Sequence, residues 1–276
     1  MTITTKDIMK IGLDLVGWKR MPFDSAIHNK GTNIRKALIA VDVSTAELFL
    51  AKNAGCDAVI AHHPIGVSSM RFHRVLDRHV QFMIQSGVPE NAARNAVKNL
   101  KRRIQIKSHA NIYKQIADAA RILKMPLVNI HQPCDEFMRR VILEKIRNCK
   151  KDHKVSDLLK LIEEIPEFKN AANRPLVTLG RAKNNVGRMA LVVAAGTNGG
   201  YTIAKLYYEH NVSTVIYLHI HPGDAVKLKA NKVRGNLIIL GHLAGDSIGL
   251  NALADKLELR GVETVRMGII SAFKKG

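Results

Sequence analysis

The sequence predicts an α/β protein of two similar halves, each built from mostly parallel βαβ units. Short apolar runs alternate with amphipathic segments along the chain, and several runs end in histidine. One run also recurs, since GCDAVIAHHPIG and NVSTVIYLHIHPGD both give a strand, histidines, proline and glycine. Open α/β sheets bind ligands beyond the carboxyl ends of their strands. A metal site is therefore expected there, in the cleft between the two halves.

The first half begins with an amphipathic segment over 5–17, which predicts a helix, and an apolar run over 37–41, which predicts a strand. Residues 44–47, Ser-Thr-Ala-Glu, have the spacing of a capping box, and Gly55 is a suitable stop for the helix that follows. A buried strand over 58–61 completes a βαβ unit. Such a unit predicts parallel strands joined by a right-handed crossover.

The rest of the chain continues the alternation. A helix is expected near 75–84, with a break at 87–89, and Ser108 is expected to cap a helix that runs to Lys124 with Ile112 on its buried face. Further strands are predicted at 126–130, 176–180, 189–195, 214–218, 237–240 and 262–266, and further helices at 135–148, 156–165, 201–210 and 244–259. The predicted division is a first half of 1–70 plus 108–138, a basic helical insert of 71–107, a helical connector of 139–175 and a second half of 176–276.

The chain is strongly basic, with 43 Lys and Arg against 23 Asp and Glu, a formal net charge of +20. Such a field attracts nucleic acid, phosphorylated small molecules or acidic partners. Residues 71–107 carry nine basic and two acidic residues, yet only Phe72 and Phe82 are aromatic there. Because single-stranded nucleic acids stack on aromatic side chains, a solvated basic surface is the alternative interpretation of this region.

Nothing in the sequence suggests a membrane protein. No apolar run approaches the roughly 20 residues that span a bilayer, and the N-terminal stretch lacks the features of a signal peptide. The cysteines Cys56, Cys134 and Cys149 have no paired spacing, so neither a disulfide framework nor a cysteine zinc site is expected. A cytoplasmic location is the expectation.

Histidines at strand ends are the main functional signal. The predicted strands deliver His62 and His63, His131, His219 and His221, and His242. Two carboxylates, Asp135 and Asp246, each follow a histidine by four residues, a spacing that places both side chains on one face of a helix. Imidazole and carboxylate ligands together suit zinc, iron, manganese, cobalt or nickel.

Five of these groups are enough to bind two divalent ions per chain: His62, His63, Asp135, His242 and Asp246. In that arrangement Asp135 bridges the ions, and open positions remain for water. Each histidine alone is more simply explained as a polar strand end, and Asp246 alone as a helix cap. The other histidines, at 28, 73, 79, 109, 153 and 210, are expected to lie on the surface.

With these residues the chain resembles the NIF-three-like family, also described as GTP cyclohydrolase I type-two-like dinuclear metal proteins. The resemblance rests on AHHPIG, IHQPCDEF and GHLAGDSIG, and covers most of the chain outside the basic insert. It implies the same five ligands, with His131 as an outer partner of the site. It also implies a ring-shaped homo-oligomer such as a hexamer. Gln132, Pro133 and Cys134 depart from the family's usual Thr-Asn-Leu, and Asp246 replaces its usual Glu.

Other polar residues could line the site. Asp42 follows the strand at 37–41, and His219 and His221 are candidates for the pocket wall. A glycine-rich turn places Gly196, Thr197, Gly199 and Gly200 between a strand and a helix, where amides could bind phosphate, although a simple tight turn is the alternative. The leading hypothesis is a metal-dependent hydrolase of a nucleotide or another phosphorylated small molecule. The resemblance implies a nucleotide-type substrate and either GTP ring opening or phosphoester cleavage. The alternative is a metal-binding or nucleic-acid-associated protein without turnover.

Overall fold

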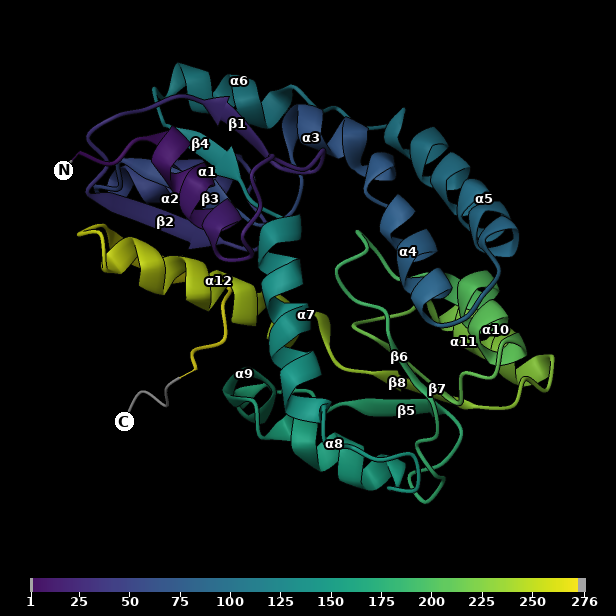
Figure 1. Ribbon diagram of the computed structural model, residues 1–276. Helices are drawn as coiled ribbons and strands as arrows, with labels where there is room; N and C mark the ends of the chain where they lie inside the picture. Colours follow the sequence, from purple (N-terminus) through teal and green to yellow (C-terminus); the bar gives the residue numbers. More distant parts are fainter. Residues whose placement is uncertain (1, 273–276) are drawn as a thin grey trace. The chain divides into compact units, whose positions relative to one another are not determined.

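The computed structural model describes residues 2–272. The chain forms two compact units, the first of Met1–Val75, Ile104–Phe137 and Asp246–Ile270 and the second of Leu76–Arg103, Met138–Gly245 and Ser271–Gly276. Each unit contains one sheet of mostly parallel strands covered by helices (Figure 1). The predicted α/β class is confirmed.

The sheet of the first unit has five strands. Their order is β1 (Ala26–Asn29), β4 (Leu127–Asn129), β3 (Ala58–Ala61), β2 (Lys36–Ala40) and β9 (Glu263–Met267). Only β1 runs antiparallel to its neighbour, and the predicted β2–α2–β3 unit has parallel strands. Helix α2 (Thr45–Asn53) begins with the predicted capping box, in which Ser44 and Glu47 satisfy each other's backbone amides.

Alternate residues of these strands pack against two different helix layers. Ala37 and Ile39 of β2 lie in a core with α1 (Thr5–Asp14) and the later turns of α12 (His242–Glu258). Leu38 and Ala40 face the opposite core, which holds α2 and α6 (Gln115–Ile122). The two-residue period of a strand thus divides one apolar run between both faces, as expected for a sheet with helices on each side.

The second unit repeats the arrangement with four strands. Their order is β5 (Leu176–Leu179), β8 (Asn236–Ile239), β7 (Thr214–Tyr217) and β6 (Met189–Leu191), with β5 antiparallel to β8 and the other pairs parallel. The order matches β1-β4-β3-β2 strand for strand. Therefore β3 and β7, the strands of the two similar sequence stretches, occupy equivalent positions, as expected for related halves.

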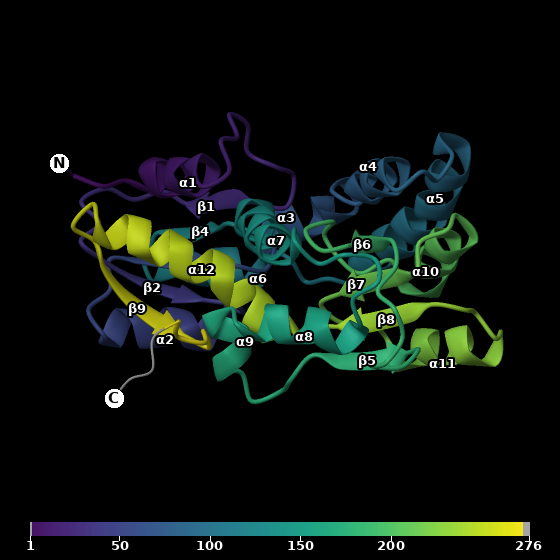
Figure 2. The ribbon, with the colours of Figure 1, turned by 60° about the horizontal axis from the view of Figure 1, so that its bottom comes forward.

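The remaining helices include α10 (Gly200–Glu209) and α11 (Pro222–Ala230), which pack against each other in the second unit (Figure 2). The others are α3 (Gly66–Arg71), the 3-10 turn η1 (Phe72–Arg74), α4 (Asp77–Gln85), α5 (Glu90–Ser108), α7 (Gln132–Ile146), α8 (Val155–Glu163) and α9 (Pro166–Asn170). Among residues 2–272, no helix has the length and apolar character needed to cross a membrane. All three cysteines are free and buried.

Three expectations about the elements were wrong. Ser108 does not cap a helix to Lys124: it ends α5, its hydroxyl bonds back to the carbonyl of Gln105, and Ile112 is 80% exposed before α6 begins. Strand β6 ends at Leu191 instead of reaching residue 195, and Ala194, within the predicted strand, has a positive φ of 60°, which lies outside the extended region. Strand β9, expected in the second half, pairs with β2 in the first sheet.

Candidate metal centre

The end of β3 fixes the two adjacent histidines. The amides of His62 and His63 donate to the carbonyls of Ala40 and Val41, so the backbone stays aligned with β2 past the last residue of the strand. Pro64 has no amide hydrogen to continue the ladder. His62 is fully buried and His63 partly buried.

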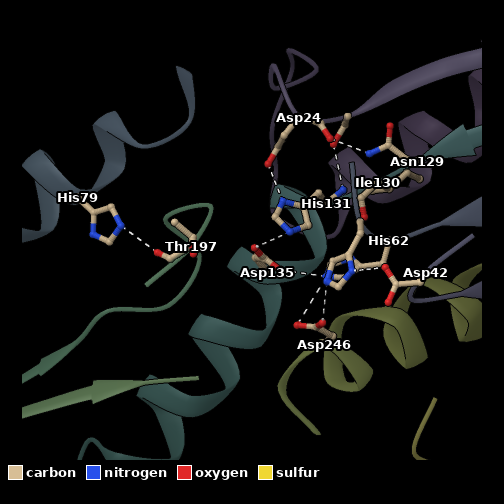
Figure 3. A network of polar contacts seen from close by, with 12 residues as sticks. Asp24, Asp42, His62, His79, Asn129, Ile130, His131, Asp135, Thr197 and Asp246 are labelled. Carbon is tan, nitrogen blue, oxygen red and sulfur yellow. Dashed lines mark hydrogen bonds and ion pairs between the residues drawn. The ribbon is translucent and has the colours of Figure 1, made fainter. Parts of the chain in front are cut away.

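Three imidazoles are held in the same way, by a hydrogen bond from Nδ1 to an oxygen. These bonds join His62 to the Ile130 carbonyl at 3.2 Å, His63 to Asp42 Oδ1 at 2.7 Å, and His131 to Asp24 Oδ2 at 2.7 Å. Figure 3 shows the bond between His131 and Asp24. A carbonyl or carboxylate oxygen accepts a hydrogen, so Nδ1 carries the proton in each neutral ring. The lone pair of each ring is then on Nε2, which is the nitrogen available to a metal ion.

All three Nε2 atoms lie near two buried carboxylates. His62 Nε2 is 3.3 Å from Asp135 Oδ1 and 3.7 Å from Asp246 Oδ1. His63 Nε2 is 3.4 Å from Asp246 Oδ2, and His131 Nε2 is 3.7 Å from Asp135 Oδ2. Asp135 comes from the first turn of α7 and Asp246 from the second turn of α12, so residues distant in sequence meet in the first unit.

The electrostatics of this cluster favour a cation. Burial by itself lowers the pKa of His62, but the carboxylates of Asp246 and Asp135 outweigh burial and hold that pKa well above its ordinary value. Burial raises the pKa of Asp135, yet the nearby charges of His131 and His62 bring it below its ordinary value. Without a metal, a proton on His62 compensates the carboxylates. A divalent ion could replace that proton.

The donor set also fits a divalent metal. Within the first unit, two groups of three bring their ligand atoms within 4.8 Å of one another: His62 with His63 and His131, and His62 with Asp135 and Asp246. His62 Nε2 is buried and makes no hydrogen bond to any of residues 2–272. Imidazole and carboxylate ligands are typical of zinc, iron and manganese sites, and in such sites the ring nitrogen that does not bind the metal usually makes a hydrogen bond.

The other predicted ligand, His242, is the first residue of α12 and precedes Asp246 by one helical turn. The centroid of its ring lies 4.5 Å from that of His219, and His219 Nδ1 lies 3.2 Å from the side-chain nitrogen Nδ2 of Asn198. His221 caps α11 by accepting a hydrogen bond from the Gly223 amide. A capping role accounts for His221 without a ligand.

The glycine-rich turn lies between β6 and α10 in the second unit, as predicted. Gly196 and Gly200 have positive φ, and the Asn198 side chain accepts a hydrogen bond from the Gly200 amide. A Cβ at Gly200 would lie only 2.8 Å from Asp224 Oδ2, so an acidic group already approaches the N-terminus of α10. Phosphate binding by Gly196, Thr197, Gly199 and Gly200 stays a prediction, and Asp224 would oppose it.

His79 was expected on the surface, and this was wrong. It is fully buried on α4, where its Nε2 donates to the carbonyl of Thr197 at 2.9 Å (Figure 3). Burial lowers its pKa to about 4, so the ring is neutral at physiological pH. The amphipathic pattern around 75–84 indicated a helix, but not that the histidine faces inward.

Asp24 is the site residue that sequence reasoning missed. It is fully buried, holds His131 through Oδ2, and its own carbonyl accepts a hydrogen bond from the Asn129 side chain. Asp24 lies 107 residues before His131 and belongs to no recognisable motif. Only its position two residues before β1, an edge strand paired with β4, could have suggested proximity to His131.

Comparisons with known proteins agree with this architecture. A model of the Duf34/NIF3 family (NGG1p interacting factor 3) matches residues 26–274. The crystal structure of a NIF3 superfamily protein from Sphaerobacter thermophilus is 39% identical, with a TM-score of 0.93 over 96% of this chain and 98% of that chain. No curated protein matches significantly.

More distant structures share the fold alone. Reduced HcgD from Methanocaldococcus jannaschii is 12% identical, with a TM-score of 0.59 over 96% of this chain and 98% of its own. TTHA1606 from Thermus thermophilus is 15% identical, with a TM-score of 0.56 over 96% of this chain and 97% of its own. Both similarities extend over nearly the whole chain.

Proposed function

This chain belongs to the Duf34/NIF3 family, and we propose that it is a metal-dependent hydrolase of a nucleotide or another phosphorylated small molecule. The observation that supports the proposal is the convergence of three oriented Nε2 atoms on the buried carboxylates of Asp135 and Asp246. In this proposal two divalent ions bind per chain, and His62, His63, Asp135, His242 and Asp246 would hold them.

A divalent ion supplies Lewis acidity, which makes a nearby water a stronger acid and stabilises negative charge on a substrate oxygen. The residues of the chain provide the geometry. Asp42 and Asp24 hold the rings of His63 and His131 in place, and burial of Asp135 limits the access of bulk water. The lowered pKa of Asp135 keeps its carboxylate ionised at neutral pH.

The net charge of +20 is consistent with an anionic substrate, because a positive field raises the local concentration of anions. The proposal also includes a cytoplasmic location and self-association into a ring-shaped oligomer such as a hexamer. Size-exclusion chromatography with light scattering would test the assembly directly.

The test of the activity is a substrate panel. Protein supplied in turn with zinc, manganese or iron(II) would be assayed on nucleotides, phosphomonoesters and phosphodiesters. We expect turnover of at least one substrate class, and a loss of about tenfold or more in Asp246→Asn, because one charged ligand oxygen is replaced by a neutral amide. Asp118→Asn, a partly exposed aspartate on α6 outside the cluster, is the matched control and should retain full activity.

Equal turnover in Asp246→Asn and Asp118→Asn would contradict a catalytic role for the cluster. Absence of turnover on every substrate with every metal would contradict the hydrolase proposal itself.

A second candidate, nucleic-acid binding, is favoured by one specific feature. Residues 91–117 contain seven Lys and Arg and no Asp or Glu. Lys98, Arg102 and Arg103 of α5 are exposed and, within residues 2–272, have no carboxylate partner. Phe82 is buried, however, and the Arg139 guanidinium lies over its ring, so Phe82 is not accessible to bases.

A salt titration separates the two candidates. Binding of generic single-stranded DNA that weakens steeply with salt, and weakens further when Lys98, Arg102 and Arg103 are replaced by glutamine, would support the second candidate. Binding that is absent at 0.1 M salt would exclude it.

A further inference from the structure

A pocket of about 250 Å³ opens in the first unit beside the histidines that follow β3. Its walls include Pro64, Ser69, Phe72, Ile104, Lys107 and Asn111. Pro64 directly follows His63, and the Phe72 ring meets the His131 ring at 61°, with 5.7 Å between centroids. The pocket therefore adjoins the proposed metal centre, because Phe72 lines the pocket and contacts His131.

The walls fit a flat ring. Phe72, Pro64 and Ile104 contribute apolar surfaces, and the face or edge of a phenyl ring pairs favourably with another aromatic ring. Drug-sized ligands occupy sites of about 300–1,000 Å³. A pocket of 250 Å³ is smaller and suits a single ring system.

The polar groups of the pocket determine which hydrogen-bonding groups a bound ring needs at its edge. The hydroxyl of Ser69 donates to the Gly66 carbonyl at 2.7 Å, and that of Ser108, also in the lining, donates to the Gln105 carbonyl at 2.6 Å. Because both hydrogens are already used, these oxygens can only accept hydrogen bonds from a ligand. A ligand that satisfies them needs N–H or O–H donors at its ring edge.

Lys107 indicates the charge of the ligand. Its ammonium is exposed at the last turn of α5 and has no carboxylate partner within residues 2–272. An ammonium only donates, and it binds carboxylates and phosphates as a point charge. The ligand therefore has an anionic group in addition to its donor-bearing ring.

We propose that this pocket binds an aromatic ring that carries N–H donors and an anionic group, and that it recognises this part of the substrate beside the metal centre. The recognition role rests on the proposed hydrolase function. Binding itself does not, because it is measured on the metal-free protein without turnover.

The test uses 2-aminobenzoate, a fluorescent compound with one ring, one amine and one carboxylate. Fluorescence titration of the metal-free protein avoids direct coordination of the carboxylate by a metal. We expect saturable binding, and an affinity about twofold to fivefold lower in Lys107→Met, the upper part of the range for one exposed ion pair. Lys98→Met, an exposed lysine on the same helix that does not line the pocket, is the matched control and should bind like the wild type.

Two related compounds define the chemistry. Aniline lacks the anion and benzoate lacks the amine, so both should bind more weakly than 2-aminobenzoate, and Phe72→Leu should weaken all three. Absence of saturable binding, or equal affinity in the wild type and Lys107→Met, would overturn the inference. Hydrolysis by the metal-supplied protein could persist in either case, so failure of the pocket is distinguishable from failure of the hydrolase proposal.

Discussion

Acidification should destabilise this protein through His79, which connects α4 to the glycine-rich turn. Its ring is fully buried, and burial lowers its pKa from 6.5 to about 4. The unfolded chain takes up this proton near pH 6.5, whereas the folded chain resists it down to about pH 4. The stabilisation is therefore complete above about pH 6.5 and is lost as the pH falls towards 4.

The size of the effect follows from the two pKa values. At about 1.4 kcal/mol per pKa unit, the difference between 6.5 and about 4 corresponds to about 3.5 kcal/mol of unfolding free energy. About 2.5 kcal/mol of this should be lost by pH 4.5. This is a large fraction of the stability of a typical domain, about 5–15 kcal/mol.

The assay compares urea unfolding of the metal-free wild type and His79→Gln at pH 7 and pH 4.5, followed by circular dichroism. Glutamine keeps an N–H that can donate to the Thr197 carbonyl but does not titrate. Other acid-sensitive groups, such as Asp135, are common to both proteins. The wild type should lose about 2.5 kcal/mol more than the variant, and parallel losses in the two proteins would refute the reasoning.

Two further predictions concern the metal centre. Gly249→Ala removes no ligand, but its new Cβ would lie 2.4 Å from the Cys134 carbonyl oxygen and push α12 away from α7, so it should lower both metal affinity and stability. The control is Gly261→Ala, where the Cβ meets open space but φ is positive; it should lower the unfolding free energy by about 1 kcal/mol and leave metal affinity unchanged. Equal metal affinity in the two variants would show that this contact does not set the ligand geometry. Metal affinity should also rise with pH until the raised pKa of His62 is passed, because His62 must lose its proton to become a ligand. Calorimetry in two buffers of different ionisation enthalpy should then detect proton release, and metal binding without it would contradict the assignment.

The parts of the fold that could be predicted are those set by local chemistry. The capping box at Ser44 and Glu47 and the apolar run before His62 each specify an element within a few residues. The convergence of His62, Asp135 and Asp246 was also predictable, because strand ends meet at one edge of a sheet and a four-residue spacing aligns side chains on a helix.

The predictions were wrong where tertiary contacts, and not the local sequence, determine the structure. Residues 90–108 contain many good helix formers, so α5 continues through Ser108, a residue whose type suggested a helix start. The burial of His79 and Asp24 depends on elements distant in sequence, namely the Thr197 turn and the strand before His131. No local pattern specifies such partners.

The most direct test of the central claim is the metal content of the purified protein. After dialysis against zinc or manganese, elemental analysis of the wild type should find about two ions per chain, the stoichiometry of a dinuclear site. The Asp135→Asn variant should retain markedly less, because Asp135 is the ligand proposed to lie between the ions. A wild type that binds no divalent ion, or an Asp135→Asn variant with unchanged content, would contradict the account.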